Sequence, residues 1–245
     1  MSRLRDAVED YLAIRRALGF KLTAHGWLLA DFAGFVEQAG VSTVTTALAL
    51  AWATSSSGTP SWCAARLSMV RGFAGYLRTL DPATEVPAAG LLSYQRRRAT
   101  PYLYSDADIA GLLTAALELG PPLRAATYHT LIGLVTVSGM RTGEAIRLDR
   151  DDVDLREGAL TVRLSKFNNS REVMVHPSTT TALRAYARQR DQLCPSPNTS
   201  SFLVSTRGSR LDASVVQKTF RDLCRRAGLD NPQVPNRPRL IDLRH

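Results

Sequence analysis

The chain has 245 residues and the composition of an ordinary globular protein, which excludes a fibrous or low-complexity chain. Its formal net charge is +9 and its pI lies near 10.0. Such a balance indicates either a polyanionic partner, most often nucleic acid, or a basic surface without a partner. Residues 1–90 hold 8 basic and 7 acidic side chains, so nearly all the excess charge lies in residues 91–245.

Cysteine usage and hydropathy narrow the class of protein further. Cys63, Cys194 and Cys224 have neither metal-ligand nor redox spacing, so we expect reduced thiols in a cytoplasmic protein. The N-terminal run MSRLRDAVEDYL is charged throughout and does not fit a signal peptide. The most apolar run, in residues 130–140, is too short to span a membrane. We therefore expect no membrane partner and no bound metal.

Residues 1–81 are predicted to form a small all-α domain. Helical spacing of apolar residues, with short loops between the runs, is found in residues 4–18, 23–38, 46–54 and 61–80. Gly19 and Gly40 are predicted to end the first two helices. Aromatic residues recur on the apolar faces, and we expect these side chains, including Trp27, to form a core rather than a ligand site.

Residues 82–104 are predicted to form a linker, because they contain three prolines and a run of charged residues. The run ends in Arg96, Arg97 and Arg98. Three consecutive arginines in a linker are either a solvated segment or a contact along the phosphate backbone of DNA.

Two helices are predicted in residues 105–119 and 123–137, and the second leads into a corner at Gly139. Arg141 lies in this corner, and its rigid, permanently charged guanidinium suits a pair of phosphate oxygens. Thr142 is placed to cap the next helix, and Glu144 is placed to brace the Arg141 side chain. Taken alone, these residues fit a phosphate site or a structural Arg–Glu pair.

The apolar pattern changes to alternation after Leu148, which predicts strands over residues 160–164 and 171–175. The loop between them contains Lys166, one of only three lysines in a chain whose other basic residues are arginines. The predicted fold class is therefore mainly α with a small β-hairpin or three-stranded sheet (α+β).

The C-terminal part is predicted to contain two more helices, over residues 177–192 and from about 212 to 226, with a short strand Phe202–Val204 between them. Arg221 and Arg225 give the second of these helices a basic face, and we expect them to contact DNA. Residues 240–245 look like the start of a further helix.

In combination these features resemble the tyrosine recombinases, the phage integrase family. The family's first-arginine box, T/S-G-x-R-x-x-E, matches residues 138–144, its β-hairpin lysine matches Lys166, and its H-x-L-R-H box aligns with residues 241–245. The resemblance covers nearly the whole chain. It implies a helical core-binding (SAM-like) domain in residues 1–81, a linker in 82–104 and a catalytic domain in 105–245.

The resemblance implies a chemistry. In the family a tyrosine attacks a phosphodiester of double-stranded DNA, forms a 3′-phosphotyrosine and releases a 5′-hydroxyl, and a partner strand reverses the step. Arg141 and Arg244 would be the catalytic clamp on the phosphate, and Lys166 would protonate the leaving oxygen, which a guanidinium does not do. Glu144 and His245 would support them. The implied partners are DNA and other recombinase protomers, with no cofactor or metal.

Two departures from the family pattern affect the expected activity. Ile241 stands where the family has a histidine, and an aliphatic group transfers no proton. The family's nucleophilic tyrosine follows this box, whereas the last tyrosine here is Tyr186. We therefore expect a recombinase truncated before its nucleophile, which does not cleave DNA. The alternatives are a non-catalytic DNA-binding protein derived from a recombinase, and a helical scaffold whose charge is incidental.

Overall fold

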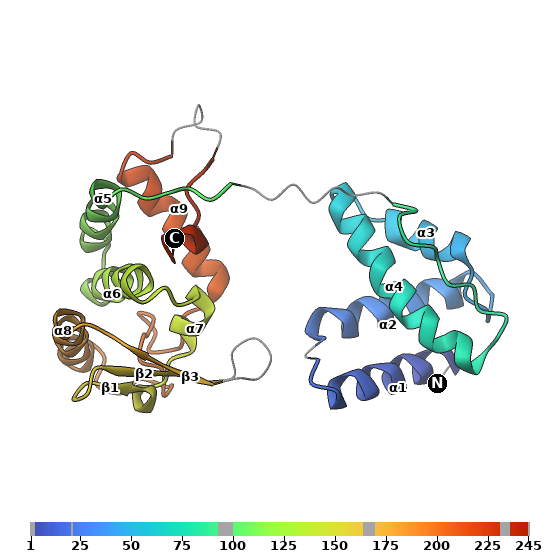
Figure 1. Ribbon diagram of the computed structural model, residues 1–245, viewed down its shortest axis with the longest axis horizontal. Coiled ribbons are helices and arrows are strands. Elements are labelled where there is room, and N and C mark those ends of the chain that lie inside the picture. The colour runs from blue at the N-terminus through green and yellow to red at the C-terminus, as the bar shows by residue number, and fades with distance from the viewer. Residues whose placement is uncertain (1–2, 21, 93–99, 164–169, 231–235, 245) are drawn as a thin grey trace. The chain divides into compact units, whose positions relative to one another are not determined.

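The computed structural model describes residues 3–20, 22–92, 100–163, 170–230 and 236–244 (Figure 1). The chain divides into two compact units, residues 1–98 and 99–245. Each unit has its own hydrophobic core. None of the described helices has the length and hydropathy needed to cross a membrane.

The described part of the first unit contains four α-helices, and α4 contacts the other three. Their bounds are α1 (Arg3–Ala17), α2 (Thr23–Gln38), α3 (Thr46–Thr54) and α4 (Pro60–Leu80). Thr45 and Thr59 cap α3 and α4 by accepting hydrogen bonds from backbone N–H groups of the first turn. The apolar faces meet in a core that includes Leu28, Leu29, Phe32, Val36, Trp52, Val70 and Phe73.

Two local predictions in this unit have different outcomes. Gly19 and Gly40 both adopt positive φ, the conformation in which glycine ends a helix, so the predicted helix ends are confirmed. Trp27, which was expected in the core, leaves 59% of its surface exposed, so that prediction is wrong. The apolar face of α2 is wider than the surface that its neighbours cover, and Trp27 lies outside the covered strip.

The described part of the second unit is a set of helices with one small sheet. Its helical elements are α5 (Asp106–Leu117), α6 (Pro122–Ser138), α7 (Thr142–Arg147), η1 (Arg150–Asp152), α8 (Pro177–Leu193), α9 (Ala213–Arg226) and η3 (Leu240–Arg244). The strands β1 (Val153–Asp154), β2 (Ala159–Val162) and β3 (Arg171–Met174) form an antiparallel sheet in the order β1-β2-β3. The predicted fold class is confirmed.

Helix α6 lies at the centre of the second unit. It contacts α5, α7, α8 and η3, which explains why its sequence is apolar on most sides (Figure 1). The core around it includes Leu112, Tyr128, Leu131, Ile132, Leu134, Val135, Met140, Leu160, Phe202, Phe220 and Leu243. The same buried helix therefore supports α7, which begins directly after Arg141, and η3, which contains Arg244.

The predicted strand Phe202–Val204 is wrong. Only isolated bridges form here, one between Val204 and Arg210 and one between Asp149 and Ser201, the residue before the segment. The segment is nevertheless buried, because its side chains fill the core. Its backbone does not take part in a ladder of strand hydrogen bonds. The third strand of the sheet is β1 instead, whose Val153 lies opposite Leu160.

Candidate active site

The corner between α6 and α7 places Arg141 at the start of a short helix. Gly139 ends α6 with a φ of 62°, a left-handed conformation that suits glycine. The next residue, Met140, is fully buried and anchors the corner in the core. Arg141 then takes the N-cap position of α7, so the expected cap at Thr142 is wrong. The Arg141 side chain is 47% exposed.

Glu144 holds both the backbone and the side chain of Arg141. One carboxylate oxygen, Oε2, accepts a hydrogen bond from the backbone N–H of Arg141 at 2.9 Å. The other, Oε1, accepts one from Nη1 of Arg141 at 2.8 Å. The expected Arg141–Glu144 contact is therefore present. Because the two bonds join the same pair of residues one turn apart, they fix the orientation of the guanidinium.

A second guanidinium reaches the same carboxylate, and sequence reasoning missed it. Arg171, the first residue of β3, donates from Nη2 to Oε2 of Glu144 at 2.8 Å and from Nη1 to Oε1 at 3.3 Å. Its side chain is 42% exposed. The alternation of apolar and polar residues predicted the strand. It did not predict which element the start of the strand contacts, because this contact depends on how the sheet packs on α7.

The cluster of Arg141, Glu144 and Arg171 carries a net positive charge. The Glu144 side chain is only 2% exposed, and burial by itself would raise its pKa. Hydrogen bonds from Arg171 and Arg141 outweigh burial and lower the pKa of Glu144 to about 2. At neutral pH two guanidiniums therefore share one carboxylate. The remaining positive charge faces solvent, which suits an anion such as a phosphate.

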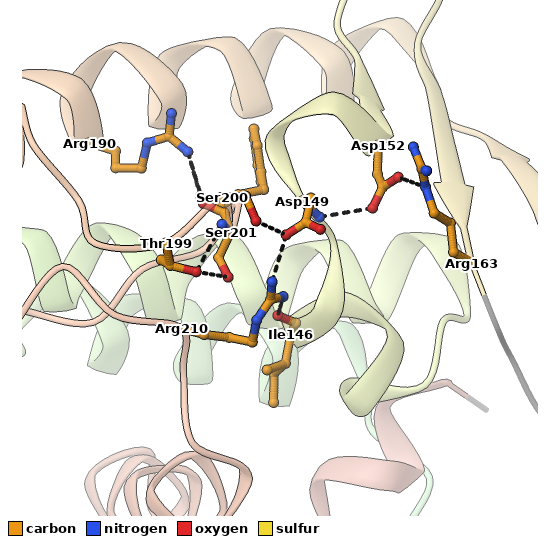
Figure 2. Close-up of polar contacts among 10 residues, drawn as sticks. Ile146, Asp149, Asp152, Arg163, Arg190, Thr199, Ser200, Ser201 and Arg210 are labelled. Carbon is orange, nitrogen blue, oxygen red and sulfur yellow. Dashed lines mark hydrogen bonds and ion pairs between the residues drawn. The ribbon is translucent and has the colours of Figure 1, made fainter.

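The C-terminal end of α7 is held by a second polar network (Figure 2). Nη1 of Arg210 donates to the backbone carbonyl of Ile146 at 3.0 Å, and Nη2 donates to Asp149 at 2.6 Å. The Ser200 hydroxyl also donates to Asp149, at 2.8 Å. These contacts tie the last turn of α7 to the buried segment around residue 201, so α7 is fixed at both ends.

The two strands next to the predicted Lys166 loop are held by separate ion pairs. Figure 2 shows Arg163, which follows β2, paired with the buried carboxylate of Asp152. Asp152 in turn accepts a hydrogen bond from the backbone N–H of Asp149 at 3.0 Å. On the other strand, Arg171 pairs with Glu144. Val162 and Arg171 lie opposite each other in the sheet, so the two arginines hold the same end of it.

Arg244 lies in η3, whose apolar side packs against α6. The buried carboxylate of Asp242 accepts two hydrogen bonds from Arg239, each 2.8 Å long, and one from the backbone N–H of Tyr102. Arg244 is partly exposed and has no ion-pair partner among the described residues. Ile241, which the resemblance aligns with a histidine, is 53% exposed.

The other predicted site residues are placed in part. Arg221 and Arg225 are both exposed on α9, and Nη2 of Arg225 lies 3.3 Å from the Asp222 carboxylate. Lys166, His245 and the run Arg96, Arg97 and Arg98 lie outside the described residues. Tyr186 is buried, and its hydroxyl contacts Thr127 and accepts a hydrogen bond from the backbone N–H of Val204.

Comparison with known proteins places the chain in a family. The model of the phage integrase family matches residues 106–245, which include Arg141, Glu144 and Arg244. The chain belongs to the phage integrase family. A family member from Sinorhizobium fredii, the putative integrase/recombinase y4rB, is 45% identical over all of this chain and 80% of its own length. The tyrosine recombinase XerC of Alcanivorax borkumensis is 28% identical over 71% of this chain and 56% of its own length.

Solved structures of integrases share this fold. A lambda integrase tetramer bound to a Holliday junction aligns with a TM-score of 0.62 and 16% identity, covering all of this chain and 71% of that one. The integrase of transposon Tn1549, in complex with a circular-intermediate DNA, aligns with a TM-score of 0.68 and 13% identity, covering 98% of this chain and 84% of that one. At these identities the likeness shows the fold alone.

Proposed function

We propose that this integrase-family chain acts in site-specific recombination by breaking and rejoining double-stranded DNA. The observation that carries the proposal is the Arg141 corner, where a half-exposed guanidinium is fixed by a buried, ionised carboxylate. A fixed cation stabilises a pentavalent phosphate without having to reorganise during the reaction. Family membership supports this use of the corner over a purely structural Arg–Glu pair.

The proposed reaction is a transfer between two oxygens on one phosphorus atom. An attacking hydroxyl releases its proton to solvent and forms a new P–O bond, and the bond to the 5′-oxygen breaks with its electron pair on that oxygen. The oxygen then takes a proton, which the family resemblance assigns to the ammonium of Lys166. Arg141 and Arg244 would bind the non-bridging oxygens, on which negative charge accumulates in the transition state.

The DNA partner is supported by charge and by the relatives. The excess of basic over acidic residues lies almost wholly in residues 91–245, where α9 exposes Arg221 and Arg225. Lambda integrase has been solved as a dimer on a core site and as a tetramer on a Holliday junction. We therefore propose double-stranded DNA and further recombinase protomers as partners of this chain. The run Arg96, Arg97 and Arg98 would add contacts to the DNA backbone.

One observation favours a non-catalytic DNA-binding protein as the second candidate. Ile241 is exposed and aliphatic at a position where the family uses a histidine, so one hydrogen-bonding group near the phosphate is missing. Binding needs the positive charge of Arg141 and Arg244 but does not need proton transfer. The expectation that this chain alone does not cleave DNA stays a prediction.

One experiment separates DNA cleavage from DNA binding without catalysis. It adds a small-molecule nucleophile to the protein–DNA complex. A labelled duplex, selected from a random pool for binding to this chain, is incubated with the protein and hydrogen peroxide. Because peroxide attacks the phosphorus, cleavage reports activation of the phosphate regardless of which residue attacks in the family. We expect cleavage at one position per strand, reduced by roughly a hundredfold in Arg141→Gln.

The matched control is Arg188→Gln, which removes an exposed arginine from α8 and should leave the peroxide cleavage unchanged. Parallel samples without peroxide are tested for protein–DNA adducts that survive SDS, and their formation would contradict the expectation that this chain alone does not cleave. If the bound duplex is never cleaved with peroxide, the proposed activity fails and binding alone remains.

A further inference from the structure

Arg171 has no assigned role in the proposed reaction, although it lies in the candidate site. It makes two hydrogen bonds to Glu144, the carboxylate that also holds Arg141. Arg171 and Glu144 come from different elements, β3 and α7. The contact brings a second cation, Arg171, to the carboxylate of Glu144. It therefore changes the charge of the site as well as its geometry.

The charge of the cluster depends on Arg171. With only Arg141 and Glu144, a guanidinium and a buried carboxylate would cancel, and Arg141 would have little attraction left for a phosphate. With Arg171 present, the carboxylate is shared between two guanidiniums, and one positive charge remains. Among the described residues the ion-pair partners of Glu144 are these two arginines.

We propose that Arg171 is a positioning residue for the phosphate site, which acts through Glu144 to keep the charge of Arg141 available to DNA. The inference rests on the proposed function. In this arrangement Arg171 need not contact the DNA itself. It neutralises Glu144, fixes the carboxylate against β3, and so lets the same carboxylate orient Arg141 without cancelling its charge.

The test is a double-variant cycle on DNA affinity. Binding of a fluorescein-labelled duplex of mixed sequence is measured at low salt for the parent chain, Arg171→Gln, Glu144→Gln and the variant with both changes. The net charge of the cluster is positive in the parent, zero in Arg171→Gln and again positive in the double variant. We expect Arg171→Gln to bind about tenfold more weakly and the double variant to recover most of that loss.

The matched control is Arg163→Gln, because Arg163 holds the neighbouring strand by an ion pair to a different carboxylate, that of Asp152. Glu144→Gln should change the affinity of Arg163→Gln by the same factor by which it changes the affinity of the parent, because Arg163 and Glu144 are not coupled. Circular dichroism and thermal midpoints of every variant establish that the compared proteins are folded. Arg171→Lys, which keeps the charge, should bind almost as tightly as the parent.

The outcomes separate this inference from the proposed function. If the double variant binds as weakly as Arg171→Gln, Arg171 acts by touching DNA or by supporting the fold, and the inference is overturned. The same follows if Arg171→Gln binds as tightly as the parent. If the parent chain has no affinity for DNA at low salt, the proposed function itself fails.

Discussion

Arg171 donates two hydrogen bonds to Glu144, a residue 27 positions earlier in the chain. This pair connects the sheet to the corner where Arg141 lies, since Glu144 also accepts hydrogen bonds from the backbone and the guanidinium of Arg141. A single buried carboxylate therefore sets the position of two half-exposed cations. The following predictions test this arrangement and the elements that support it.

The carboxylate of Glu144 should make stability depend on pH. Its pKa in the folded protein is about 2, below the ordinary 4.5, so its contribution is present above pH 4.5 and is lost as the pH falls towards 2. Glu144→Gln should lower the free energy of unfolding at neutral pH by roughly 2 kcal/mol. Urea unfolding at several pH values checks this. A difference from the parent that stays constant down to pH 2 would contradict it.

Arg190 should be required for stability rather than for DNA binding. Its side chain is 1% exposed and donates to the backbone carbonyl of Phe202 at 2.8 Å and to Asp191 at 2.7 Å. Arg190→Met would leave a buried carbonyl without a partner and should cost on the order of 3 kcal/mol in urea unfolding. Arg188→Met, on the exposed side of the same helix, is the control. Equal stability of the two variants would argue against this role.

Tyr186 should be structural and not a nucleophile. Burial raises the pKa of Tyr186, and its hydroxyl is already bonded to Thr127 and Val204. Tyr186→Phe should lower the free energy of unfolding by about 1 kcal/mol and leave the yield of SDS-resistant protein–DNA adducts formed without peroxide unchanged. Adducts that the parent chain forms, and that a folded Tyr186→Phe variant does not form, would show that this interpretation is wrong.

The two exposed arginines of α9 should differ in their effect on DNA binding. Arg221 has no ion-pair partner among the described residues, whereas Arg225 shares Asp222 with Arg226. Affinity falls with salt, and Arg221→Gln should make the slope of log affinity against log salt shallower by about 1. Arg225→Gln should make it shallower by less. Fluorescence anisotropy over a salt series measures both slopes. Unchanged slopes in both variants would remove α9 from the proposed interface.

The sequence predicted the parts of the fold that depend on residues close together in the chain. Helix α6 was predicted to within a residue at each end, because an apolar run is bounded by Pro122 and by a glycine that takes a left-handed conformation. The contact between Arg141 and Glu144 was predicted for the same reason, since three positions along a helix bring two side chains together.

The parts that depend on distant packing were missed. The pairing of Arg171 with Glu144 requires the register of β2 with β3 and the placement of the sheet on α7, and neither follows from alternation. The segment Phe202–Val204 is apolar enough for a strand. Its backbone pairs with other segments only through isolated bridges and forms no ladder. Trp27 has helical spacing with the core residues, yet no neighbouring helix covers it.

The salt dependence of DNA binding, measured for the parent chain and for the variant Arg141→Gln/Arg244→Gln, tests the central claim most directly. We predict that the parent binds duplex DNA with an affinity that falls steeply with salt. The double variant should bind at least tenfold more weakly. Its slope of log affinity against log salt should be shallower by about two, because two phosphate contacts are lost. A double variant that matches both the parent and the Arg188→Gln control in affinity and slope would contradict the assignment of these two arginines to the phosphate.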